Sequence, residues 1–282
     1  VLTSRANGSN NTELAGFPHH SLDSYLPKLV RAGMRVAICD QLEDPKMVKG
    51  IVKRGVTELV TPGVTFNEQV LTSKKNNFLM SIHKEKEKFG VALVDISTGE
   101  LLVSEGNLDK ILHIVDTFDP SEIIYQRRTD IPQKLKEKNS FQLEDWAYQY
   151  PFAYEKLNNH FKTKSLKGFG IEEYRLAIIA TGAIFTYLVE DTHHSLLQHI
   201  TKIQSIPQED YLTLDNFTLR NLEIVHSNNP NGKSLLDIVD HTLTPMGGRL
   251  LRRRVILPLK NVNEINRRLS LICLLYTSDA AD

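Results

Sequence analysis

Apolar positions in the first part of the chain predict one helix followed by one strand. Ser21 precedes an apolar series with helical spacing, so it is a candidate N-cap, and Gly33 is placed to end the helix. The series comprises Leu22, Tyr25, Leu26, Leu29 and Val30. The apolar run 36–39 is bounded by polar residues and predicts a short buried strand. The earlier segment 5–13, RANGSNNTE, is rich in Asn, Gly and Ser and predicts a mobile loop.

The central part of the chain has the pattern of a complete α/β unit. Three strand-like runs with turn signals between them predict an antiparallel meander, and helical and strand-like spacings follow it. The expected strands lie at 76–84, 88–97, 99–106 and 121–128, and the expected helices at 107–119, 176–190 and 197–204. Strands followed by helix and strand in alternation favour a mixed sheet flanked by helices.

Helical spacing dominates the last part of the chain. A strand-like segment at 211–215 comes first. Helices are then expected at 219–225, 235–243, 248–257 and 261–272, with Pro258 ending the third. Length is consistent with these divisions, because 282 residues are enough for about two domains with real cores.

Composition restricts the function classes. Hydrophobic residues make up 41% and charged residues 24%, as in ordinary globular proteins, and no apolar run has the roughly 18 residues needed to span a membrane. Val1 onward has no signal-peptide pattern, and two distant cysteines, Cys39 and Cys273, fit a reducing cytosol. The formal net charge is zero, so contact with DNA would need a local basic patch.

Three segments resemble the MutS family of bacterial DNA mismatch repair proteins. The first is 14–46, with a Gly-x-Pro-x-His turn at 16–20 and Val-Ala-Ile-Cys-Asp-Gln at 36–41. The second is VTELVTPGV at 56–64, and the third joins 211–225 to HTLTPMGGRLLRRRVILPL at 241–259. They occur in the order of the family and cover most of the chain.

The resemblance implies a multidomain α/β protein. It implies a partial mixed α/β mismatch-binding domain, a ribonuclease H-like α/β connector domain and the start of a mainly helical core and lever domain. The expected ranges are 1–63, 64–206 and 207–272 in that order. The last ten residues, CLLYTSDAAD, resemble translated sequencing-adapter read-through, so 273–282 is predicted to be a non-native tail.

The resemblance also implies what an intact parent protein would do. The parent would bind mismatched duplex DNA as a homodimer, use ATP and Mg²⁺, and recruit a MutL-type partner in the bacterial cytoplasm, close to the nucleoid. The Phe-x-Glu wedge of the family is absent from residues 1–63, and both ends of the chain resemble truncations. This piece is therefore expected to link sensor and motor, to be no enzyme by itself, and to carry no cofactor.

Candidate DNA contacts come from two basic segments of the expected mismatch-binding domain. Arg5 opens the polar loop that, by resemblance, lies against the DNA backbone, where an arginine can pair with a phosphate through two hydrogen bonds. The stretch 46–54, KMVKGIVKR, contains four basic residues and no acid. It supplies Lys49, Lys53 and Arg54 as further candidates. The alternative is that these charges are an ordinary solvated surface.

Structural roles are expected at turns and domain boundaries. Gly16 and Pro18 would shape the turn into the Ser21 helix, and Pro62 with Gly63 would form the hinge between domains. The segment 244–247, which includes Pro245 and Gly247, resembles a packing turn at the base of the lever, with Gly247 and Gly248 allowing close backbone approach.

Two other functions remain open from the residues alone. Asp95 could hold a metal ion in a stand-alone ribonuclease H-like nuclease, together with Glu122, Glu190 or Asp191, although no spacing forces these carboxylates together. The chain could instead be a non-enzymatic connector that docks a partner through 64–206.

Other metal and phosphate motifs are weak. The pairs His19-His20 and His193-His194 are poor chelators because adjacent side chains diverge. Gly232-Lys233-Ser234 lacks the earlier Gly of a P-loop, so a turn followed by an N-cap at Ser234 is favoured, and no ATP or metal site is expected.

Overall fold

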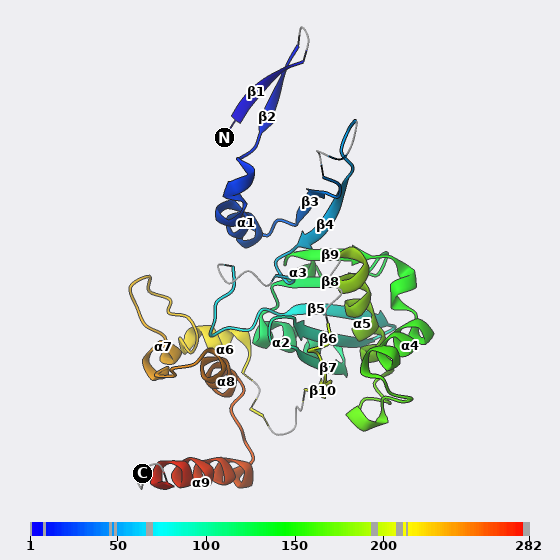
Figure 1. Cartoon of the computed structure of the whole chain (residues 1–282). Coiled ribbons are helices and arrows are strands. Elements are labelled where there is room, and N and C mark those ends of the chain that lie inside the picture. Colours follow the sequence, from blue (N-terminus) through cyan, green and yellow to red (C-terminus); the bar gives the residue numbers. More distant parts are fainter. Residues whose placement is uncertain are drawn as a thin grey trace.

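Three regions follow one another along the chain (Figure 1). The computed structural model describes residues 2–7, 10–44, 47, 50–65, 70–192, 197–206, 211–212 and 214–278. An N-terminal region contains two small sheets and a helix, a central region contains a six-stranded sheet with helices, and a C-terminal region is mainly helical over its described residues.

A hairpin opens the N-terminal region. Strands β1 (Leu2–Asn7) and β2 (Asn10–Ala15) pair in antiparallel fashion, with Arg5 opposite Thr12. The mobile loop predicted for 5–13 is therefore wrong over the paired residues. Strand pairing satisfies the backbone hydrogen-bonding groups of polar residues as well as those of apolar ones, so a polar composition does not exclude a strand.

The next helix and strand confirm the sequence pattern in part. Helix α1 (Leu22–Arg31) follows a short 3-10 turn (His19–Ser21), and β3 (Val36–Gln41) pairs with β4 (Arg54–Val60). Ser21 stands at the N-cap position but makes no side-chain capping bond. Leu26, Val30 and Val60 form a small core between helix and sheet. Residues of β3 are only half-buried or exposed, so the burial predicted for this strand is wrong.

The central sheet contains the predicted meander. Its strand order is β10-β7-β6-β5-β8-β9, with β5, β6 and β7 antiparallel and with β8 and β9 added in parallel on the other side of β5. The strands are β5 (Leu79–Glu85), β6 (Lys88–Asp95), β7 (Glu100–Gly106), β8 (Glu122–Gln126), β9 (Ser140–Leu143) and β10 (Gln204–Ser205). The helices are α2 (Leu108–Phe118), α3 (Gln133–Lys136), α4 (Tyr150–Phe161) and α5 (Arg175–Thr186).

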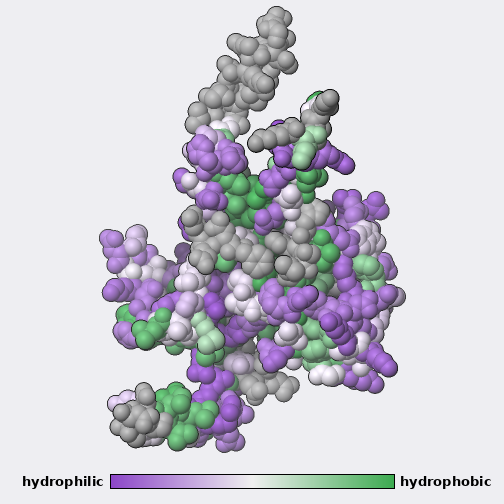
Figure 2. Space-filling model, viewed as in Figure 1, coloured by the Kyte–Doolittle hydropathy of each residue, from purple (hydrophilic) through white to green (hydrophobic). Residues whose placement is uncertain are grey.

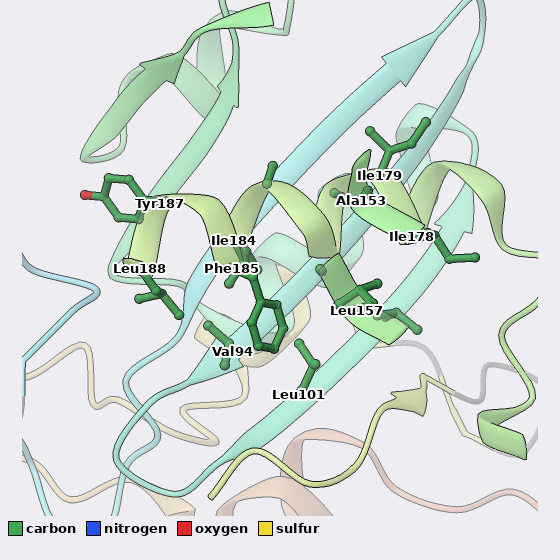
Figure 3. Packing of buried hydrophobic residues seen from close by; sticks show 14 of the residues in the cluster. Val94, Leu101, Ala153, Leu157, Ile178, Ile179, Ile184, Phe185, Tyr187 and Leu188 are labelled. Atoms are coloured by element: carbon green, nitrogen blue, oxygen red, sulfur yellow. The ribbon is translucent and has the colours of Figure 1, made fainter. Parts of the chain in front are cut away.

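Helix α5 forms the centre of the larger core. Every residue from Leu176 to Thr186 is buried, because α5 lies between the sheet and α4. Figure 3 shows Phe185 directed toward Val94 and Leu101 of the sheet. On the α4 side the backbones are close, since a Cβ atom on Gly182 would lie 2.3 Å from the Cβ of Ala153. Helix α2 covers the opposite face with a second cluster that includes Ile111 and Val115.

One prediction for the central region is wrong, and helix α4 was not predicted. The helix expected at 197–204 is wrong: Leu197, Ile200 and Ile203 are buried from an irregular segment that leads into β10. Their spacing of three residues imitates a helix, although it reflects three separate contacts with the core. Helix α4 lies in the polar stretch to which no helix was assigned.

The C-terminal region is helical, as expected. Its helices are α6 (Asn216–Asn221), α7 (Leu235–Val239), α8 (Pro245–Ile256) and α9 (Val262–Ser278). The strand predicted at 211–215 is wrong, because the described part forms one isolated bridge between Tyr211 and Leu259. Figure 2 shows hydrophobic surface on α9, where Leu269, Leu274 and Tyr276 are exposed.

Candidate functional site

The loop between β3 and β4, with Arg54 at the start of β4, presents basic and apolar side chains together. Lys53 and Arg54 are exposed, and the Lys53 amide donates to the Glu43 carboxylate at 3.2 Å. Ile51 is 98% exposed, so its side chain contacts solvent and hardly touches the rest of the protein. Lys49 lies outside the described residues. A loop of this kind can contact phosphates through its cations and an apolar surface through Ile51.

Arg5 lies on the β1–β2 hairpin, but its side chain is not among the described ones. The hairpin and the β3–β4 loop both extend away from the central sheet (Figure 1). Gly16 and Pro18 lie in the irregular segment that leads into α1, where the Ser21 amide donates to the Pro18 carbonyl oxygen at 2.9 Å.

A buried carboxylate fixes the junction between the N-terminal and central regions. Pro62 and Gly63 form a tight turn between Thr61 and Val64 that packs on the start of β8. The Glu122 carboxylate accepts hydrogen bonds from the Gly63 amide at 3.0 Å, from the Tyr187 hydroxyl at 2.5 Å and from the Thr61 hydroxyl. Burial and the neighbouring Glu122 charge raise the pKa of Tyr187, so Tyr187 remains a hydrogen-bond donor.

Arg35 adds a second contact across the same junction. Its guanidinium lies 3.5 Å from the centre of the Phe141 ring, which belongs to β9. Stacking of this kind stabilises a partly desolvated arginine. Close by, a Cβ atom on Gly33 would lie 2.6 Å from the side-chain oxygen of Asn139. Neither Arg35 nor Glu122 was assigned to this junction from the sequence, because each acts on residues distant in the chain.

Asp95 is a structural anchor, contrary to the nuclease hypothesis. It is 1% exposed, and its carboxylate accepts bonds from both the amide (3.0 Å) and the hydroxyl (2.6 Å) of Ser97, and from Asn76 (2.8 Å) and the Asn77 amide (3.3 Å). These donors occupy the oxygens that a metal ion would need.

The remaining carboxylates of that hypothesis are engaged elsewhere. Glu122 is committed to the junction described above, and Glu190 forms an ion pair with Lys156 at 3.0 Å. The side chain of Asp191, like His193 and His194, lies outside the described residues. Within the part of the chain that the structure describes, no group of three or more His, Cys, Asp or Glu side chains could hold a metal ion.

Ser234 confirms the interpretation of the Gly-Lys-Ser segment as a helix start. Its hydroxyl accepts from the Asp237 amide at 3.2 Å, and the Asp237 carboxylate accepts from the Ser234 amide at 2.9 Å. This reciprocal capping box begins α7.

Ionic contacts from α8 and from the end of α7 attach the C-terminal region to the central region. Arg253 binds the Glu100 carboxylate through both terminal nitrogens, and Lys74 binds Asp240 at 3.1 Å. Hydrogen bonds from Thr242 and the charge of Lys74 lower the pKa of Asp240 to about 2.

The residues 244–247 begin α8 and do not form a turn between elements. Pro245 is the first helical residue, and the Thr244 hydroxyl accepts from the Gly247 amide at 3.1 Å. The close approach expected from the two glycines occurs at Gly248, where an added Cβ would lie 2.6 Å from Lys74.

Comparison with known families agrees with this arrangement. Models of MutS domain I, MutS domain II and MutS domain III match residues 1–69, 77–201 and 217–282, respectively. The chain belongs to the MutS family. The N-terminal, central and C-terminal regions correspond to domains I, II and III, and domain II is the connector.

Curated relatives give the same result. The DNA mismatch repair protein MutS of Christiangramia forsetii is 54% identical over 275 residues, covering 96% of this chain and 32% of that protein. Its counterpart in Flavobacterium psychrophilum is 57% identical over 272 residues, with 95% and 31% covered. That of Bacteroides thetaiotaomicron is 51% identical over 279 residues, with 96% and 32% covered.

The chain therefore spans about a third of the length of the curated relatives it matches. The chain covers regions that match MutS domains I, II and III. No helix in its described ranges is both long and apolar enough to cross a membrane.

Proposed function

We propose that this chain supplies the DNA-facing and connecting parts of a mismatch recognition protein. The matches to MutS domains I, II and III, in the family's order, support this role. In the whole protein these parts would act on mismatched duplex DNA within a homodimer, and an ATPase elsewhere would use ATP and Mg²⁺. We expect this protein to work in the bacterial cytoplasm.

The proposed domain ranges are 1–63, 64–206 and 207–272, with 273–282 as a non-native tail. A ribonuclease H-like connector is supported by its antiparallel meander β5–β7, extended by the parallel strands β8 and β9. Under this proposal the connector would also dock a MutL-type partner. A binding assay with that partner that detects no complex would contradict the docking role alone.

The observation that carries DNA contact is the exposed loop between β3 and β4. Lys53 and Arg54 can neutralise phosphates there, and Lys49 and Arg5 are proposed to extend the same contact. The exposed Ile51 lies two residues before Lys53 and can pack against sugar or base edges of the duplex. This surface provides affinity with little sequence information, since phosphate contacts do not read bases.

The test is fluorescence anisotropy with a labelled duplex, either fully paired or containing one G·T mismatch. We expect weak binding that decreases steeply with salt and differs little between the two duplexes. Replacing both Lys53 and Arg54 by alanine should reduce affinity for both and flatten the salt dependence by about two units of slope. Replacing Lys86 and Lys88 of the connector by alanine is the matched control. Equal losses in the two double variants would show that the loop is not the DNA contact.

A further inference from the structure

Cationic side chains from the connector and from α8 surround the C-terminal end of α2. Lys75 and Lys138 come from the connector, and Arg252 comes from α8. The carboxylate of Asp119, directly after α2, accepts hydrogen bonds from Lys75 at 2.9 Å and Lys138 at 2.8 Å. Lys75, Lys138 and Arg252 therefore surround the Asp119 carboxylate. Lys134 and Arg220 line the larger cavity as well, together with Asp116, which pairs with Lys134 at 2.9 Å, so the cations around the junction outnumber these carboxylates.

Arg252 is the cation of this cluster whose charge is least compensated. Within the described part of the chain, its guanidinium makes no hydrogen bond or direct ion pair, and Asp119 and Asp237 attract it only at longer range. Its neighbours on α8 are engaged: Arg253 binds Glu100, and Arg249 donates to the Ser73 carbonyl oxygen at 2.8 Å. Burial lowers the pKa of Arg252, as expected for a desolvated charge.

Two cavities meet at this cluster. Arg252 and Asp119 line both of them, and the cavities have volumes of about 40 and 830 Å³. Lys138, Lys134 and Arg220 also line the larger one. Small-molecule sites commonly have volumes of about 300–1,000 Å³, so the larger cavity has room for a ligand, and the smaller one extends it only toward Lys75.

We propose that this junction binds a phosphate-bearing ligand, with a di- or triphosphate group held by Arg252, Lys75 and Lys138. The guanidinium of an arginine matches two phosphate oxygens, and lysines add point charges around them. A multiply charged anion would supply the negative charge that Asp119 alone does not.

The phosphate group could belong to free polyphosphate or to a nucleotide. Phe217 lines the larger cavity and is 75% exposed, so its ring is available to stack on a base. A nucleotide would use this ring in addition to the cations, whereas inorganic polyphosphate would use the cations alone. The two sources therefore differ in their dependence on Phe217.

The test is isothermal titration calorimetry of the full chain with sodium tripolyphosphate and, separately, with ATP, both without Mg²⁺. Arg252→Ala should weaken binding of both probes by about tenfold or more, because it removes charge-assisted hydrogen bonds. Arg254→Ala is the matched control, since Arg254 lies on the same helix, is exposed and lines neither cavity. Thermal melting of each variant establishes that it is folded.

Two further variants complete the design. Lys138→Gln tests the connector side and should also weaken both probes. Phe217→Ala should weaken ATP alone if the ligand is a nucleotide, and neither probe if it is polyphosphate. Failure of both probes to bind, or equal losses for Arg252→Ala and Arg254→Ala, would show the proposal to be wrong. So would binding of duplex DNA, but of neither probe, that depends on Arg252.

Discussion

Asn77 donates a hydrogen bond from its side-chain amide to the carbonyl oxygen of Pro62, at 2.9 Å. Its neighbour Asn76 donates to Glu100 at 3.3 Å, and Glu100 in turn holds Arg253 of α8. Two consecutive residues before β5 therefore contact both the turn that leaves domain I and the carboxylate that anchors domain III. We expect changes at this pair to affect both junctions of the connector.

Coupling between Asn76 and Arg253 is the first prediction. In a double-mutant cycle with Asn76→Ala and Arg253→Ala, the free energies of unfolding should deviate from additivity by about 1 kcal/mol, because both side chains bind Glu100. Urea unfolding gives these energies. The pair Asn76→Ala and Arg254→Ala should be additive, since Arg254 is exposed and does not bind Glu100. Additivity in both cycles would contradict the coupling.

Tyr187→Phe should reduce the free energy of unfolding by about 1.5–3 kcal/mol, the usual range for a hydrogen bond to a charged group. The substitution removes one donor from the buried Glu122 carboxylate and leaves the packing of the ring almost unchanged. Thermal or urea unfolding measures the change. Tyr276→Phe is the control, because Tyr276 is 82% exposed on α9 and should change stability by less than about 0.5 kcal/mol. A loss at Tyr187 no larger than at Tyr276 would contradict the role of this bond.

Gly63→Ala should destabilise the junction by about 1–3 kcal/mol through overpacking. An added Cβ would lie 2.7 Å from the Cβ of Glu122 and 3.2 Å from that of Leu79. Gly168→Ala is the matched control, since nothing lies within 4 Å of a Cβ at that position. Unfolding curves for the two variants should differ clearly, and hydrogen exchange should locate the loss at the turn of residues 61–64. Equal stability of the two variants would show that this turn is loosely packed.

Acid should remove the stabilisation provided by Asp119. Burial opposes ionisation of Asp119, but hydrogen bonds from Lys138 and Lys75 outweigh it and lower its pKa to about 2. Since the folded pKa lies below the ordinary value of 3.8, the stabilisation is present above about pH 4 and is lost as the pH falls toward 2. It should be on the order of 1 kcal/mol, because Asp119 is half exposed to solvent.

The matched experiment compares the original chain with Asp119→Asn by thermal melting from pH 7 to pH 2. The variant should melt at a lower temperature near neutrality, and the two curves should converge in acid. A difference that stays constant over the whole range would contradict the assignment.

Local patterns predicted the connector better than the contacts between domains. The β5–β7 meander could be predicted because its strands are apolar runs, buried on both faces, with turn signals between them. Helix α2 could be predicted because its apolar positions have helical spacing and pack on the sheet. The segment 197–204 misled the same reasoning, since its apolar residues reach the core from an irregular segment that contains a turn. The roles of Arg35 and Glu122 could not be predicted, because their partners lie far away in sequence and depend on how the domains meet.

Both junctions of the connector lie at the same end of its central strands. Glu122 begins β8 and Glu100 begins β7, and both lie at the end of the sheet where β6 finishes with Asp95. The sheet is therefore attached at one end of its strands, to domain I through Glu122 and to domain III through Glu100. If the sheet rotated about this attached end, the opposite end, at Glu85 and Lys88, would be displaced the most. A displacement of domain I would then reach domain III by a short path across the adjacent ends of β8, β5, β6 and β7.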